Sequence, residues 1–248
     1  ISMPDTNTGF DQALTSSPTG QAPLKLAVQR SGRLTESTLG LLHTIGLQFE
    51  SYGQRLFSHC RNFPLSILYG RDDDIPGYIA RGTVDLGIVG RNLLYEEGAD
   101  VVELVPLGFG YCELVVATMR DAPYTDPGQL LNARIATSYP QSARRYFQSI
   151  GGDPEIITIS GSVEVAPSLG LADAIVELTA TGSTLLLNDL RQMHTILESE
   201  AVLAASPDSA CAIHAFATSV CGQSRRVGCV MFPAASPTST RQPVAASW

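Results

Sequence analysis

The sequence predicts an α/β protein with mostly parallel strands. Short apolar runs typical of buried strands alternate along the chain with segments whose apolar residues recur at helical spacing. Hydrophobic residues make up 44% of the chain and charged residues 16%, a composition that favours a folded core over disorder. The length of 248 residues suits one large domain or two small lobes around a cleft.

The first part of the chain has no periodic apolar face. Residues 1–22 are rich in serine, threonine, proline and glycine, so we expect a disordered arm there. The first strand is expected at residues 24–28, followed by a turn over residues 29–33. A helix with one apolar side then runs to Gly46, which is placed to act as its C-terminal cap.

The same order of elements then repeats. A strand at residues 65–69 leads through an acidic exit to a short helix, for which Asp74 is the expected N-cap and Pro76 lies in the first turn. From residue 206 to 248 no helix or strand period is sustained, and we expect an irregular tail. The other strands are expected at residues 84–89, 112–118, 134–137, 156–159 and 174–178.

The net charge and the cysteine pattern argue against several classes of ligand and site. A net charge of −8 argues against broad attraction to nucleic acid or anionic membranes. A polyanionic ligand would therefore have to be bound by local features, such as helix N-termini, backbone amides and a few arginines. The five cysteines are scattered without a C-x-x-C pair, which argues against a zinc knuckle or a disulfide framework. The sequence shows no leader pattern and no apolar run of about 18 residues, and we expect a cytoplasmic location.

The strongest local signal is the segment from residue 172 to 185. An apolar strand delivers Glu177 at its end, and the hydroxyl-rich loop Thr179–Thr184 follows before an apolar run that can start a helix. Such a loop can turn amides and hydroxyls toward a phosphate, and Gly182 allows close backbone approach. The alternative is an ordinary strand–turn–helix junction with Thr181 or Ser183 as N-cap.

Two further turns suit anionic ligands. Arg30 and Arg33 flank Ser31-Gly32 at a strand-to-helix turn, where ligands of α/β sheets collect; the alternative is a solvated basic turn. The segment Arg71–Asp74 precedes a strand ending at Gly90. Adjacent carboxylates point in different directions, so we expect no protein-only metal site, and any Mg²⁺ should arrive with phosphates.

The sequence does not decide the roles of residues 138–139 and of two arginines in the helix that follows them. A strand at residues 134–137 leads to Ser138 and Tyr139, which could face a cleft, while Arg144 and Arg145 could equally be a solvated helix face. The histidines do not form a metal-binding set, and no hydrolase motif is present.

Taken together, these segments resemble the ATP phosphoribosyltransferase family, in particular its long, self-regulated branch. The agreement covers roughly residues 24–204 and includes LKLAVQRSGRL, RDDDIPGYIARGTVDLGIVGRNLL, RIATSYP and ADAIVELTATGSTL in this order. The resemblance implies a fold of two lobes similar to type II periplasmic binding proteins, with the active site in the cleft. Lobe I would hold residues 23–108 and 188–205, and lobe II residues 109–187.

The resemblance also implies a reaction and its site. N1 of ATP would attack the anomeric carbon of phosphoribosyl pyrophosphate, and pyrophosphate would leave with Mg²⁺; a homodimer or homohexamer would be the assembly. Arg33 and Glu177 would be the catalytic residues. The substrates would be bound by Arg30, Ser31, Gly32, Arg55, Arg71, Gly90, Asp173, Thr179, Thr181, Gly182, Ser183 and Thr184.

The chain departs from the family pattern at several points. Arg30 replaces the usual lysine, Glu177 the usual aspartate and Glu113 the usual arginine of a Cys-Arg-Leu motif. Residues 206–248 do not resemble the expected histidine-binding regulatory domain, which predicts impaired histidine feedback and argues against the larger assembly. Two rival interpretations therefore stay open: a catalytically inactive regulatory relative, and a solute-binding protein of similar fold.

Overall fold

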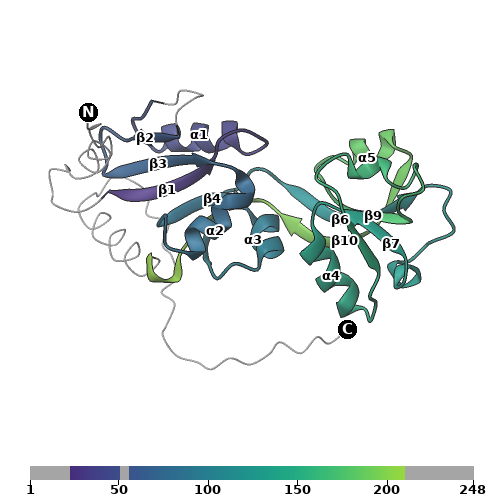
Figure 1. The fold of residues 1–248 in the computed structure, drawn as a ribbon. Helices are drawn as coiled ribbons and strands as arrows, with labels where there is room; N and C mark the ends of the chain where they lie inside the picture. The colour runs from purple at the N-terminus through teal and green to yellow at the C-terminus, as the bar shows by residue number, and fades with distance from the viewer. Residues whose placement is uncertain (1–22, 51–55, 210–248) are drawn as a thin grey trace, which may run out of the picture. The chain divides into compact units, whose positions relative to one another are not determined.

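The computed structural model describes residues 23–50 and 56–209. The expected N-terminal arm, nearly all of the expected tail and Arg55 lie outside the described residues. In the described part of the chain, strands and helices alternate as the sequence predicts, and the strands form two sheets (Figure 1).

The first sheet has the strand order β2-β3-β1-β4-β11-β5. Strand β1 pairs in parallel with β3 and with β4, so the carboxyl ends of these three strands meet at one edge. The remaining pairs are antiparallel. The strands are β1 (Leu24–Gln29), β2 (Phe57–His59), β3 (Leu65–Gly70), β4 (Leu86–Gly90), β5 (Val102–Pro106) and β11 (Ala201–Ala205).

The second sheet has the order β10-β6-β9-β7-β8. Strand β7 is parallel to β8 and β9, whereas β6 is antiparallel to β9 and β10. The strands are β6 (Cys112–Met119), β7 (Arg134–Thr137), β8 (Glu155–Thr158), β9 (Ala174–Thr179) and β10 (Leu190–Ser199).

Helices cover the sheets. Figure 1 shows α1 on one side of the first sheet and α2 and α3 on the other. The α-helices are α1 (Thr35–Thr44), α2 (Ile75–Ala80), α3 (Arg91–Glu97), α4 (Pro140–Ser149) and α5 (Ser183–Leu187), and the 3₁₀ turns are η2 (Asp72–Asp74), η3 (Pro127–Leu130) and η4 (Val163–Val165). Among the described helices, none combines the length and apolar character needed to cross a bilayer.

The first sheet packs tightly against α2. Ile75 and Ile79 are fully buried against Ala27 and Val89. A Cβ atom at Gly87 would lie 2.5 Å from Cδ1 of Ile79, so glycine is what lets the helix approach β4. Burying each of these large side chains stabilises the fold by about 1.5–3 kcal/mol.

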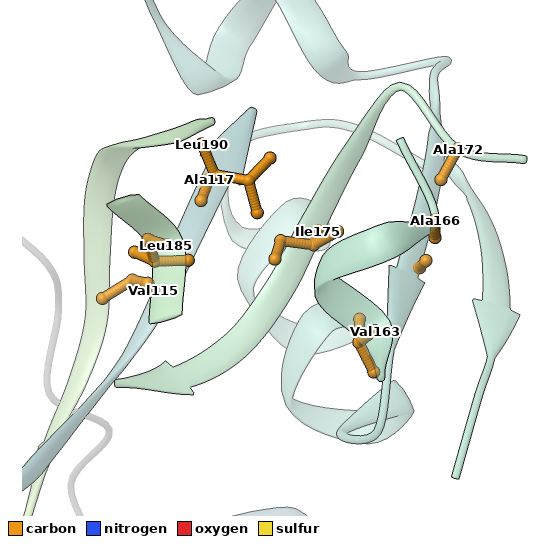
Figure 2. Packing of buried hydrophobic residues seen from close by; sticks show 9 residues of the cluster. Val115, Ala117, Val163, Ala166, Ala172, Ile175, Leu185 and Leu190 are labelled. Atoms are coloured by element: carbon orange, nitrogen blue, oxygen red, sulfur yellow. The ribbon is translucent and has the colours of Figure 1, made fainter. Parts of the chain in front are cut away.

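The central strands of the second sheet, β6, β7 and β9, are buried on both faces. Leu114 and Val116 of β6 pack with Phe147 of α4, while Val115 and Ala117 face a separate cluster. In Figure 2 the side chain of Leu185 lies near Val115 and that of Leu190 near Ala117. Two buried faces explain why the strand sequences read as continuous apolar runs rather than as alternating patterns.

Four details differ from the sequence-based expectations. The strand pairing is mixed rather than mostly parallel, because four of the nine strand pairs in the described residues are parallel and five are antiparallel. Asp74 occupies the N-cap position of α2 but makes no side-chain cap hydrogen bond, because η2 leads directly into the helix. Residues 190–199 were expected in the first lobe, but they pair with β6 in the second sheet, and the chain crosses to the first sheet only at Glu200. The expected strand at residues 84–89 is found at Leu86–Gly90.

Candidate active site

The turn that follows β1 is built around the buried side chain of Gln29. Its Nε2 donates to Oδ2 of Asp72 at 2.9 Å, and its Oε1 accepts the backbone N–H of Leu34 at 3.0 Å. Gly32 has a φ of +135°, and a Cβ atom there would lie 2.3 Å from Nε2 of Gln29. Glycine is therefore required both by the backbone conformation and by the space that Gln29 occupies.

A cavity of about 380 Å³ opens beside this turn. Residues from both sheets line it: one wall comes from the ends of β1, β3 and β4, and the other from the ends of β7 and β9. The lining residues are Gln29, Ser31, Gly32, Arg33, Leu34, Asp72, Gly90, Asn92, Leu93, Tyr139 and Leu178. This is the edge where parallel α/β sheets bind ligands.

The structure brings some of the predicted site residues to this cavity. Ser31, Gly32, Arg33 and Gly90 all line it. Arg33 is exposed and donates a hydrogen bond from Nη1 to the carbonyl oxygen of Gly110, which lies on the connection from the first sheet to the second. Its guanidinium thus bridges the turn after β1 and this connection.

Two other predicted arginines lie on the surface. Arg30 and Arg71 are exposed and are not among the residues that line the cavity. The guanidinium of Arg71 lies 3.8 Å from Asp73, a distance at which a pair of exposed side chains contributes little stability. Both arginines flank the cavity wall in sequence, next to Ser31 and Asp72.

Glu177 stands near the carboxyl end of β9 and is partly buried. Burial raises the pKa of its carboxyl to about 7, and the negative charge of Glu164 adds to this increase. The hydrogen bond from the backbone N–H of Leu178, at 2.9 Å, opposes it, and the hydroxyl of Ser138 acts in the same direction. Near neutral pH this carboxyl is therefore poised between its charged and neutral forms.

The loop after Glu177 is held by its own hydroxyl groups. The amide of Gly182 donates to Oγ1 of Thr179 at 2.9 Å, and the hydroxyls of Thr181 and Ser183 are 2.8 Å apart. Gly182, with a φ of +72° and open space around it, is itself the N-cap residue of α5. The alternative with Thr181 or Ser183 as N-cap is therefore wrong. Thr184 is exposed in the first turn of α5.

Asp173 is not brought together with the other predicted site residues. It precedes β9, roughly 13 Å along the strand from Glu177 at the usual rise per residue. Its carboxylate binds Arg134, with Nη2 of the arginine 2.9 Å from Oδ1. This hydrogen-bonded pairing lowers the pKa of Asp173, and both groups lie at the amino ends of β7 and β9.

Tyr139 is one of the residues that the sequence left undecided. It lines the cavity and packs against the hydrophobic clusters of both sheets. Burial raises the pKa of its hydroxyl, and the negative charges of Glu177, Asp72 and Asp73 contribute in the same direction. An aromatic residue after a strand was the only signal for it.

Asn92 is a cavity residue that sequence reasoning missed. Its side chain is buried, and its Oδ1 accepts a hydrogen bond from the hydroxyl of Ser199 at 3.0 Å. A Cβ atom at Gly90 would lie 2.4 Å from the same Oδ1. The pattern Gly-x-Asn after a buried strand is the signal that could have identified it.

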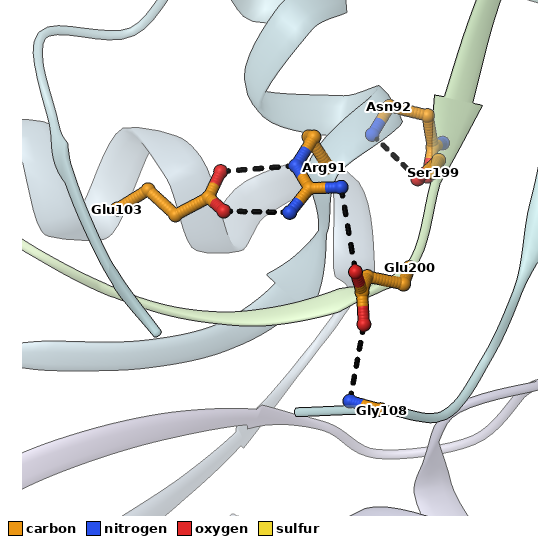
Figure 3. A network of polar contacts seen from close by, with 6 residues as sticks. All are labelled: Arg91, Asn92, Glu103, Gly108, Ser199 and Glu200. Atoms are coloured by element: carbon orange, nitrogen blue, oxygen red, sulfur yellow. Dashed lines mark hydrogen bonds and ion pairs between the residues drawn. The ribbon is translucent and has the colours of Figure 1, made fainter. Parts of the chain in front are cut away.

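A network of charges holds the start of α3, whose first residue follows Gly90 of the cavity lining. Arg91 binds Glu103 with two hydrogen bonds, of 3.1 and 2.7 Å, and lies 3.6 Å from Glu200 (Figure 3). Glu200 in turn accepts the amide of Gly108 at 3.1 Å. Since Glu200 separates β10 from β11, this network ties together both segments that connect the sheets.

Among the described residues, no group of three or more histidine, cysteine, aspartate or glutamate side chains is placed to hold a metal ion. In the acidic turn, Asp72 is engaged by Gln29. Partial desolvation raises the pKa of the exposed Asp73 carboxyl, as do its acidic neighbours, whereas Arg71 lowers it.

Glu113, where the family pattern has arginine, is satisfied by the neighbouring strand. Its Oε2 accepts hydrogen bonds from Thr195 at 2.9 Å and Gln192 at 3.2 Å, both on β10. Its strand partner on the other side is Thr179. The acidic side chain thus serves the pairing of β6 with β10.

The chain is similar in sequence to known proteins. The family model described as "HisG: ATP phosphoribosyltransferase" matches residues 71–221. An ATP phosphoribosyltransferase of Cytophaga hutchinsonii is 44% identical over 184 residues, and one of Stenotrophomonas maltophilia is 44% identical over 199 residues. These matches cover 74% and 75% of this chain but only 64% and 66% of the relatives, so the chain spans about two thirds of their length.

Solved structures show the same fold. The ATP phosphoribosyl transferase (HisG:HisZ) complex of Thermotoga maritima contains a chain with a TM-score of 0.69 and 29% identity, covering 80% of this chain and 95% of that one. The aliphatic sulphonate binding protein SsuA of Escherichia coli has a TM-score of 0.50 at 16% identity, over 80% of this chain and 66% of that one. The likeness to SsuA concerns the fold alone and confirms the predicted resemblance to periplasmic binding proteins. With its family model covering more than half of the sequence, the chain belongs to the ATP phosphoribosyltransferase (HisG) family.

Proposed function

We propose that this chain joins ATP to 5-phosphoribosyl 1-pyrophosphate, forming N1-(5-phosphoribosyl)-ATP and pyrophosphate in the first step of L-histidine biosynthesis. The observation that carries the proposal is the cavity between the ends of the two sheets. Its walls hold the turn Gln29–Leu34 on one side and Tyr139 and Leu178, next to Glu177, on the other. A reaction between two polyanions requires a site that holds both partners in alignment.

The loop Thr179–Thr184 is the proposed site for the ribose 5-phosphate. Its side-chain hydroxyls and the open space at Gly182 suit close approach of a phosphate. Glu177, in its ionised form, would accept hydrogen bonds from the vicinal ribose hydroxyls. Each hydrogen bond of this charged kind contributes about 1.5–3 kcal/mol.

The turn after β1 is the proposed site for the phosphates of the second substrate or of the leaving group. Ser31, Gly32 and Arg33 line the cavity, and the guanidinium of Arg33 has donors besides the one that binds Gly110. An arginine there can stabilise the charge that develops on the departing pyrophosphate. No covalent nucleophile is needed, so alignment and charge stabilisation account for the proposed catalysis.

Mg²⁺ is proposed as a component of the substrate rather than as a resident of the protein. The described carboxylates do not offer a protein-only site, and bound pyrophosphate would supply most of the oxygen ligands. The ion would neutralise phosphate charge. The roles of Arg30, Arg71 and Asp173 in binding remain proposals that rest on the family resemblance.

The test is an absorbance assay for the adduct, with ATP, phosphoribosyl pyrophosphate and Mg²⁺. Thr184→Ala removes an exposed hydroxyl of the loop and should lower kcat/KM by about tenfold or more, the effect of losing a hydrogen bond to a charged group. Thr44→Ala, at the exposed end of α1, is the matched control and should leave the rate unchanged. Absence of adduct with the unmodified chain would favour the inactive regulatory relative.

A further inference from the structure

The carboxylate of Glu96 connects a helix of the first sheet to a helix of the second. Glu96 lies on α3 and is only 8% exposed. Its Oε1 accepts the amide of Gln141 at 2.9 Å, and its Oε2 accepts the amide of Ser142 at 2.8 Å and the hydroxyl of Ser142 at 2.6 Å. Three donors at the start of α4 thus converge on one buried carboxylate.

Helix α4 receives no side-chain cap from its own N-cap residue. Its N-cap residue is Tyr139, which makes no side-chain cap hydrogen bond, and Pro140 at the first helical position has no amide to donate. The first amides of a helix need partners, and its amino end favours a negative charge. Glu96 meets both requirements from a different helix, 45 residues earlier in the sequence.

A second contact secures the same pair of helices. Arg145 of α4 donates from Nη2 to the carbonyl oxygens of Tyr95 and, at 3.1 Å, of Glu96. Its guanidinium also lies 4.5 Å from the centre of the Tyr95 ring. The cation therefore sits at the carboxyl end of α3, where a positive charge is favourable.

These contacts lie on both sides of Tyr139 in the sequence, and Tyr139 lines the cavity. Tyr139 lies directly before Pro140, and its amide donates to Oγ1 of Thr137 at 2.8 Å. Its backbone is thus held by β7 on one side and, through the proline and Gln141, by Glu96 on the other. Its ring packs against the clusters of both sheets.

We propose that Glu96 is a positioning residue, which holds Tyr139 at the wall of the cavity and so keeps the parts of the site contributed by the two sheets in alignment. The effect on catalysis rests on the proposed function. The alternative is that Glu96 only caps and stabilises α4, without any effect on the geometry of the site. The two differ in whether the effect of Glu96 passes through Tyr139.

The first measurement is hydrogen–deuterium exchange, which needs no activity. Glu96→Gln replaces one acceptor oxygen by an NH₂ group that faces donors. It should speed exchange in peptides covering residues 138–143 by about tenfold or more, corresponding to about 1.4 kcal/mol of local stability. Glu97→Gln, the exposed neighbour on the same helix, is the control and should change nothing. Unchanged exchange at residues 138–143 in Glu96→Gln would overturn the proposal even if the enzyme is active.

The second measurement is a double-mutant cycle on adduct formation. Glu96→Gln and Tyr139→Ala should each lower kcat/KM by about tenfold, and the double variant should be no more than about twofold worse than Tyr139→Ala alone. If the two losses multiply, Glu96 does not act through Tyr139 and the inference fails. If no variant or parent forms adduct, the proposed function fails instead, and the exchange result still decides whether Glu96 holds this segment.

Discussion

Gln29 holds Asp72 at the wall of the cavity. Its side-chain amide donates to the carboxylate at 2.9 Å while its oxygen accepts the amide of Leu34 at 3.0 Å. The strands β1 and β3 run parallel, with Gln29 opposite Gly70, so their turns leave the same edge of the sheet. One side chain therefore sets the relative positions of two turns that line the proposed site.

Replacing Gln29 by leucine should destabilise the protein. Leucine keeps the volume but leaves the Leu34 amide and the Asp72 carboxylate without this partner, which should cost about 1–3 kcal/mol in the free energy of unfolding. Chemical denaturation measures this loss. Gln148→Leu, at an exposed position of helix α4, is the control and should change stability by less than about 0.5 kcal/mol. Equal effects of the two substitutions would show that the link is unimportant.

Gly32→Ala should disturb the same turn by a different route. The added Cβ would lie 2.3 Å from Nε2 of Gln29, at a φ of +135°. We expect a loss of about 1–3 kcal/mol in stability and weaker binding of phosphoribosyl pyrophosphate or ATP, measured by calorimetry. Gly40→Ala provides the opposite control. It lies within α1 with nothing within 4 Å, so alanine should stabilise the protein by about 0.5–1 kcal/mol. A Gly32→Ala protein as stable as its parent would contradict the proposed packing.

The sequence was sufficient to predict those strands and helix ends whose pattern lies within a few consecutive residues. Strand β7 was expected at residues 134–137 and lies at Arg134–Thr137. The apolar run that ends at Glu177 likewise predicted β9, and Gly46 ends the first helical segment with a φ of +90°. Buried strands and glycine-terminated helices carry their information within a few residues, which is why pattern analysis found them.

Contacts between distant segments were not predictable. Asp173 forms an ion pair with Arg134, and this contact depends on the pairing of β7 with β9. The contact of Glu96 with Ser142 depends on how α3 meets α4, which no single segment encodes. Strand β2 has three residues and lies at a sheet edge, too short for a period to appear.

Glu177 should make the stability of the protein depend on pH. Burial raises its pKa to about 7 from an ordinary value of 4.5, so the folded state binds the proton more tightly than the unfolded state. The stabilisation is fully present below about pH 4.5 and is lost as the pH rises through about 7. The total change should be on the order of 2 kcal/mol.

Glu177→Gln is the test of this pH dependence, because the amide does not ionise. The difference in unfolding free energy between the variant and its parent should shift in favour of the variant between pH 4.5 and 8. Glu155→Gln, which removes an exposed carboxyl from β8 of the same sheet, is the control. Parallel pH curves for Glu177→Gln and its parent would mean that the carboxyl titrates at its ordinary value.

Arg91 should stabilise the protein because it neutralises the carboxylates of Glu103 and Glu200. It binds Glu103 and Glu200, and the three side chains are only 17–34% exposed. Arg91→Met keeps the apolar stem but leaves two half-buried carboxylates without their counter-ion, which should cost about 1–3 kcal/mol. Thermal unfolding at low salt gives the measurement.

The control for Arg91 is a surface pair of the same composition. Arg61 pairs with Glu50, but these side chains are 70% and 42% exposed, so Arg61→Met should change stability by less than about 1 kcal/mol. Adding Glu103→Gln to Arg91→Met should recover part of the loss, because it removes one of the unneutralised charges. If the double variant is less stable than Arg91→Met, then desolvated charge is not the cause. The network would then act through the geometry of its hydrogen bonds at the crossing marked by Glu200.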